Sequence, residues 1–288
     1  MLKKQRLFRA FDNSVKLLTN GQGEVKLPYI KRTVQAGNVI YIKKYYSSRY
    51  GGVNRFKKST SVNPTSTKMK EINERNAVEK LTWLINSNFE QGDYHLTLTY
   101  AGECPTVDEA KENLRKLNRK LRAEYKKAGK NFKYVEVTEY ESTRIHHHIV
   151  LKAIDSKVLT KAWRFGSIHI RPLYSSGDFA NLAAYLVKET KRTFQNEDVK
   201  RKRWNASKNL EKPKIKKEIV DADSWTESPT ALKGYYIVED SIYSDITIEG
   251  YPFQTYKMIK ISDKKGTIND KQCNYPRKVD RKSGAQNK

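Results

Sequence analysis

The chain has 288 residues, which is enough for one large domain or two small ones. Lysines and arginines number 57 against 32 acidic residues, and the net charge of +25 predicts a polyanionic partner, in the first place nucleic acid. Tyrosine, phenylalanine and tryptophan are interspersed among these cations, a mixture that favours single strands because aromatic rings stack on unpaired bases. Cys104 and Cys273 lie far apart, which excludes a disulfide framework and a cysteine zinc site.

Residues 1–70 are basic and poor in acidic residues. Strand-like runs occur at Glu24–Ile30 and Asn38–Tyr46, and a loop rich in Ser, Gly, Asn and Lys follows over Ser47–Thr67. We interpret this region as a basic N-terminal extension that contacts DNA. No long apolar run follows Met1, so we expect neither a signal peptide nor a transmembrane segment, and a cytoplasmic protein.

Residues 71–215 carry the strongest periodic patterns and predict an ordered domain. Helical spacing and strand-like alternation follow each other along this region. The expected elements are helices at Ile72–Phe89, Thr106–Lys127, Ile154–Trp163 and Phe179–Lys191, and strands at Tyr94–Tyr100, Phe132–Tyr140, Arg144–Lys152 and Ser167–Pro172. This order favours an α+β fold in which helices cover one face of an antiparallel sheet.

Residues 216–262 form a β-rich C-terminal extension with strand-like runs at Gly234–Val238, Ile246–Ile248 and Thr255–Ile259. Its role stays open at this point, with duplex DNA and a partner protein as the alternatives. Residues 263–288 are polar and charged, a composition typical of disorder.

Three of the five histidines are consecutive, at His146, His147 and His148, within an apolar strand pattern. Alternate residues of a strand share a face, so His146 and His148 point one way and His147 points toward a core. The two imidazoles on one face, about 6–7 Å apart, can converge on one metal ion. The alternative interpretation is a pair of half-buried polar residues on a sheet.

A hard divalent ion also requires oxygen ligands. Glu139 lies on the preceding strand just across the turn and is the preferred donor, with Glu136 and Glu141 as alternatives. We therefore predict a site for Mg²⁺ or Mn²⁺ formed by His146, His148 and Glu139.

Tyr185 and Lys188 lie three residues apart on a predicted helix and therefore share a face. A phenol has a pKa of about 10 and is a poor nucleophile, but a neighbouring ammonium group favours its ionised form. Lys188 could supply that charge or contact a phosphate. A core tyrosine beside a solvated lysine is the alternative.

Together these segments resemble the HUH (histidine–hydrophobic–histidine) endonuclease superfamily, in particular the replication initiators related to the filamentous-phage gene II protein. The run 96–100 (LTLTY) is similar to the first motif of the family, and the run 144–148 (RIHHH) is similar to the second, with His147 in the middle position. The run 185–188 (YLVK) is similar to the third motif.

The resemblance implies an HUH-type nuclease domain over residues 71–215, with a central antiparallel sheet of about five strands flanked by helices. It implies a metal-dependent endonuclease of rolling-circle replication. Tyr185 attacks single-stranded origin DNA with the help of Lys188, forms a 5′-phosphotyrosine and frees a 3′-hydroxyl. The expected DNA-binding residues are Arg144, Lys116, Arg119, Lys120, Lys191, Arg192, Arg201, Lys202 and Arg203.

Two departures from the family pattern bear on the mechanism. The predicted helix has one tyrosine where the filamentous-phage type has two, so termination uses a second subunit or a second round on Tyr185. The chain contains no Gly-x-x-x-x-Gly-Lys phosphate loop, which implies a separate host helicase in a bacterial cell. An HUH transposase, a relaxase and a non-catalytic basic nucleic-acid-binding protein are the alternatives, and a phage, a plasmid or an integrated element could carry the gene.

Overall fold

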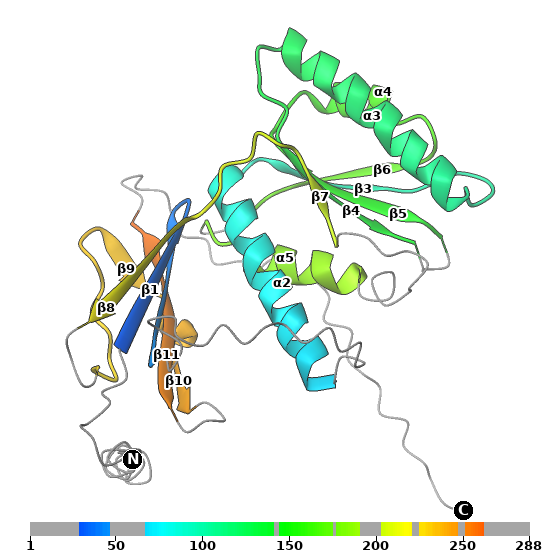
Figure 1. Ribbon diagram of the computed structural model, residues 1–288. Helices are drawn as coiled ribbons and strands as arrows, with labels where there is room; N and C mark the ends of the chain where they lie inside the picture. Colours follow the sequence, from blue (N-terminus) through cyan, green and yellow to red (C-terminus); the bar gives the residue numbers. More distant parts are fainter. Residues whose placement is uncertain are drawn as a thin grey trace, which may run out of the picture.

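The computed structural model describes residues 29–46, 67–140, 144–174, 177–190, 203–220, 225–246 and 251–261. These residues form two antiparallel sheets, and helices pack between and around them (Figure 1). Within the described ranges, no helix combines the length and the apolar character that crossing a membrane requires.

The first sheet has five strands and confirms the predicted α+β fold. Its order is β6 (Ile168–Pro172), β3 (Tyr94–Leu98), β5 (His146–Leu151), β4 (Tyr134–Glu139) and β7 (Asn205–Ala206), and all neighbouring strands are antiparallel. The histidine strand β5 is therefore the central strand, flanked by β3 and β4.

Helices cover both faces of this sheet, so the expectation of helices on one face was wrong. The helices are α2 (Thr67–Asn88), α3 (Val107–Lys127), α4 (Ser156–Ala162) and α5 (Ala180–Glu189). α3 and α4 pack on one face, where Leu117 clusters with Ile149. α2 and α5 pack on the other, where Leu186 clusters with Val150. The side chains from His147 to Leu151 are all buried, so their pattern does not distinguish a covered face from an open one.

The second sheet, here called the accessory sheet, combines strands from both ends of the chain. Its order is β10 (Tyr243–Ile246), β11 (Pro252–Lys260), β2 (Val39–Tyr46), β1 (Tyr29–Ala36) and β8 (Lys214–Val220), and β9 (Tyr235–Ile237) also pairs with β11. The sequence placed these strands in two separate extensions. The structure instead pairs residues of the N-terminal region with residues of the C-terminal region in one antiparallel sheet.

The accessory sheet meets the rest of the protein at α2. The turn between β1 and β2 lies so close to the helix that a Cβ atom added to Gly37 would stand 2.0 Å from the carbonyl oxygen of Asn86. Gly37 also has a φ of +58°, a conformation that L side chains rarely adopt. Beside this turn, Val34 and Ala36 form a small buried cluster with Trp83 of α2.

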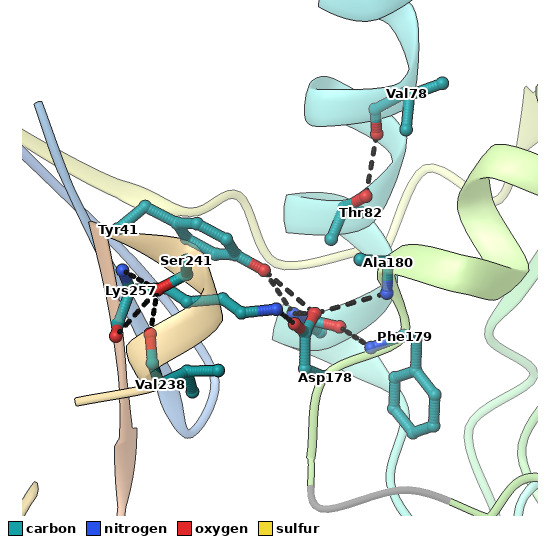
Figure 2. A network of polar contacts seen from close by, with 10 residues as sticks. Tyr41, Val78, Thr82, Asp178, Phe179, Ala180, Val238, Ser241 and Lys257 are labelled. Atoms are coloured by element: carbon teal, nitrogen blue, oxygen red, sulfur yellow. Dashed lines mark hydrogen bonds and ion pairs between the residues drawn. The ribbon is translucent and has the colours of Figure 1, made fainter. Parts of the chain in front are cut away.

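Asp178 lies directly before α5, at the junction of the two sheets (Figure 2). Its Oδ2 accepts a hydrogen bond from Nζ of Lys257 in β11 at 2.6 Å, and its Oδ1 accepts one from the hydroxyl of Tyr41 in β2 at 3.1 Å. Asn86 of α2 donates to the same Oδ1 at 3.2 Å, and the backbone N–H of Ala180 donates at 3.1 Å. One carboxylate thus joins two accessory strands to α2 and to the first residue of α5.

The charge states of this network follow from its contacts. Burial raises the pKa of Asp178, but the hydrogen bond and the charge of Lys257 outweigh burial and bring that pKa below its usual value. Burial, followed by the negative charge of Asp178, raises the pKa of Tyr41, so its hydroxyl keeps the proton that it donates. The network is therefore an ion pair with added neutral donors at neutral pH.

We expect Gly37→Ala to lower the free energy of unfolding by about 2–5 kcal/mol, because the methyl group adds both a left-handed backbone cost and a backbone clash. Gly129→Ala is the matched control, since Gly129 also has a positive φ (+67°) but open space around it. That control should lose only about 1–2 kcal/mol. Urea unfolding measures both variants, and equal losses would contradict the close contact at Gly37.

Candidate functional site

The histidine strand lies in the register that the sequence predicted. His148 pairs with Val137 of β4 and with Thr97 of β3, and the side chains of this face point toward α5. His146 lies opposite Glu139, with its Nδ1 3.9 Å from the carboxylate Oε2. Two histidines and one carboxylate of the prediction therefore occupy one face of the sheet.

His147 points to the other face, into the core under α3. Its Nε2 lies 2.8 Å from the hydroxyl of Tyr100 and its Nδ1 lies 2.8 Å from the hydroxyl of Thr138. Because one nitrogen of a neutral imidazole donates and the other accepts, the two hydroxyls satisfy both. A histidine is therefore stable at a position that the family motif gives to an apolar residue.

The structure brings three potential metal ligands together at the edge of this face. One ligand atom from each of Glu139, His148 and Glu189 lies within 4.8 Å of the others. Glu139 ends β4, His148 lies in β5, and Glu189 is the last residue of α5. His146 is not part of this group of three but stands beside it through Glu139. Two carboxylates and an imidazole form a donor set that fits a hard divalent cation.

A second histidine orients His148 from the neighbouring strand. Nε2 of His95 lies 3.3 Å from Nδ1 of His148, and the hydroxyl of Thr97 lies 3.4 Å from the same nitrogen. These contacts occupy Nδ1 and leave Nε2 of His148 to bind a ligand. Burial lowers the pKa of His148 to about 4 and that of His95 to about 3, so both are neutral at pH 7, as metal binding requires.

Tyr185 of α5 faces this group. Its ring centroid lies 5.4 Å from that of His148 and 6.1 Å from that of His95, and both contacts are edge-to-face. The side chain is half-buried, with Leu186 and Val187 of the same helix packed in the core. Lys188 is exposed at the last turn of α5 and therefore projects farther into solvent than Tyr185.

The predicted DNA-binding residues are spread over different parts of the molecule. Lys116, Arg119 and Lys120 are exposed on α3, which covers the face of the sheet opposite Tyr185. Arg144 donates hydrogen bonds to the carbonyl oxygens of Tyr100 and Gly102. The others are Arg203, which is half-buried with Glu74 nearby, and Lys191, Arg192, Arg201 and Lys202, which lie outside the described residues.

Sequence reasoning missed two residues of the site. His95 lies in the predicted strand 94–100, and Glu189 follows Tyr185 by four residues, which places both on the same face of the helix. Of the alternative carboxylates, Glu136 points to the opposite face of the sheet and accepts a hydrogen bond from Asn118 of α3. Glu141 lies outside the described residues.

Residues 93–194 match a family model of replication-associated proteins, the family described by its ORF2 and gene II protein members. The matched region begins just before β3 and ends just after α5, so it contains His95, the histidine strand and Tyr185. This match supports a role in DNA replication. Neither the curated proteins nor the solved structures include a match to the chain.

We expect Glu189→Gln to weaken Mn²⁺ binding by about tenfold or more, because it replaces an anionic oxygen donor of the group with a neutral amide. Isothermal titration calorimetry measures the affinity directly. Glu112→Gln, on the exposed surface of α3, is the matched control and should bind Mn²⁺ like the parent. Parent-like affinity in Glu189→Gln would remove Glu189 from the ligand set.

We expect the metal-free protein to lose stability as the pH falls from 7 to 5. Burial lowers the pKa of His147 to about 3, whereas an imidazole in the unfolded chain takes up its proton near pH 6.5. The folded state therefore binds fewer protons in this window, and its stability falls with pH. His95 and His148 act in the same direction.

The contribution of His147 to this loss at pH 5 is about 2 kcal/mol. Urea unfolding at both pH values should show a pH dependence in His147→Gln that is smaller by this amount, although the variant is less stable at pH 7. An unchanged pH dependence would show that His147 titrates normally in the folded protein.

Proposed function

We propose that this protein initiates replication by nicking single-stranded origin DNA, with Tyr185 as the nucleophile. The observation that carries the proposal is the position of the Tyr185 ring, 5.4 Å from that of His148, on the face of the sheet where Glu139, His148 and Glu189 gather. The replication-associated family match over residues 93–194 supports the same conclusion. A non-catalytic DNA-binding protein would not require a phenol beside a cluster of metal-ligating groups.

Glu139, His148 and Glu189 would hold a Mg²⁺ or Mn²⁺ ion, with His146 as a further donor next to Glu139. When bound, such an ion would neutralise charge on the scissile phosphate and make the phosphorus more electrophilic. His95 holds the ring of His148 with its Nε2 available. The protein thus fixes the ligand before DNA arrives, which reduces reorganisation at the moment of reaction.

Tyr185 supplies the covalent step of the proposed reaction. Its phenol loses a proton, the oxygen forms a bond to phosphorus, and the bond from phosphorus to the 3′ oxygen breaks. The products are a 5′-phosphotyrosine and a free 3′-hydroxyl that primes synthesis. Lys188, on the exposed side of the helix, is placed to contact a phosphate of the incoming strand or to stabilise the phenolate.

Termination and strand separation require partners in this proposal. With one nucleophilic tyrosine, the reverse transfer uses Tyr185 in a second round or in a second copy of the chain. The 3′-hydroxyl then attacks the phosphotyrosine and reseals a circle. A host helicase opens the duplex, because the sequence contains no phosphate-loop motif of its own.

We expect Tyr185→Phe to abolish the covalent protein–DNA adduct and to leave DNA affinity near that of the parent, because only the nucleophilic oxygen is removed. The substrates are labelled single-stranded oligonucleotides that tile the DNA around the gene, incubated with Mn²⁺. A denaturing gel detects the adduct.

Tyr174→Phe, at an exposed tyrosine after β6, is the matched control and should form the adduct normally. EDTA should suppress the adduct in the parent. Parent-like nicking by Tyr185→Phe would rule out the assigned nucleophile.

A further inference from the structure

The accessory sheet carries a concentration of positive charge that the proposed nicking site does not use. Its six strands contain nine lysines and arginines and only two acidic residues, Glu218 and Asp245. A sheet needs no such excess for its own pairing. An excess of one sign on a folded surface indicates a partner of the opposite sign.

Three of these cations form a row across one face of the sheet. Lys217 of β8 is the register partner of Arg32 in β1, and Arg32 is the register partner of Lys43 in β2. Like charges directly opposite each other destabilise a sheet. Glu79 of α2 offsets part of this charge through an ion pair with Arg32 at 3.1 Å. Burial, and then the charge of Arg32, lower the pKa of Lys43, which shows that the row is crowded with positive charge.

Aromatic side chains continue the same face beyond the cation row. Tyr45 of β2 is the register partner of Phe253 in β11, and the ring of Tyr243 in β10 lies 5.8 Å from that of Phe253. Nζ of Lys43 lies 5.4 Å from the centre of the Phe253 ring and 5.8 Å from that of Tyr45. Tyr243 is 54% exposed, and its hydroxyl donates a hydrogen bond to Asp245.

We infer that this face of the accessory sheet binds single-stranded DNA, with phosphates on the cation row and unpaired bases on the aromatic side chains. Stacking on aromatic rings requires unpaired bases, because the faces of bases in a duplex are covered by their neighbours. The inference rests on the proposed function in that DNA is the partner. It adds a second DNA-binding surface, on the sheet that Asp178 joins to the helix carrying Tyr185.

The test measures binding without cleavage. All proteins carry Tyr185→Phe and are kept in EDTA, and fluorescence anisotropy follows a labelled single strand of about 30 nucleotides, long enough to span several site sizes, and the corresponding duplex. We expect Tyr243→Ala to weaken single-strand binding about tenfold, the usual effect of losing one stacked base, and to leave duplex binding within about twofold. We expect Lys43→Gln combined with Lys217→Gln to lower the slope of log affinity against log salt by about 1.4.

Two matched controls accompany these variants. Tyr236, which is 44% exposed on β9 at the other end of β11, is replaced by alanine, and single-strand affinity should not change. Lys126→Gln combined with Lys161→Gln removes two exposed charges from α3 and α4, and it should lower the salt slope less than the pair in the cation row.

Equal losses in the test and control variants, or equal losses on duplex and single strand for Tyr243→Ala, would overturn the inference. The comparison stays readable if Tyr185 is not a nucleophile, because no protein in the assay can use it. Failure of the nicking proposal and failure of this inference are therefore distinguishable.

Discussion

The buried ion pair between Asp178 and Lys257 is the contact on which the arrangement of the two sheets depends. Removing charges from water costs several kcal/mol per ion, and that cost is recovered only where the geometry is good and the remaining hydrogen-bonding positions are filled. Asp178 meets this condition through a tyrosine hydroxyl, a side-chain amide and the backbone N–H of Ala180. Because Ala180 begins α5, the same carboxylate fixes the start of the helix that carries Tyr185. The accessory sheet and the candidate site therefore share one anchor.

The sequence predicted the arrangement of the histidine strand because strand periodicity is short and strict. Alternation alone placed His146 and His148 on one face and His147 on the other, and the short turn before the strand brought Glu139 opposite His146. The helix spacing around Tyr185 was equally readable from its apolar neighbours. These predictions succeeded because each depends on residues close together in the chain.

Features that depend on contacts between distant segments were not predictable from local patterns. The pairing of β1 with β8 and of β2 with β11 joins segments whose periodicity identifies them as strands but does not name their partners. For the same reason His95 was not connected with His148, since it lies on a different strand, and Glu189 was not connected with Glu139. The α3 cations were assigned to DNA from their charge alone. Only the packing of that helix shows that they lie across the sheet from Tyr185.

The interleaved origin of the accessory strands has a consequence for the order in which the protein matures on the ribosome. The hairpin of β1 and β2 emerges first, but its flanking partners β8 and β11 are translated only after the whole five-stranded sheet. Until then both outer edges of the hairpin lack partners, and open strand edges favour pairing with other chains. The five-stranded sheet, in contrast, has all its strands available once β7 has been made. The nascent chain can therefore complete the part with the histidines and Tyr185 before its N-terminal hairpin finds a stable place, which makes that hairpin the segment most in need of protection by chaperones during synthesis.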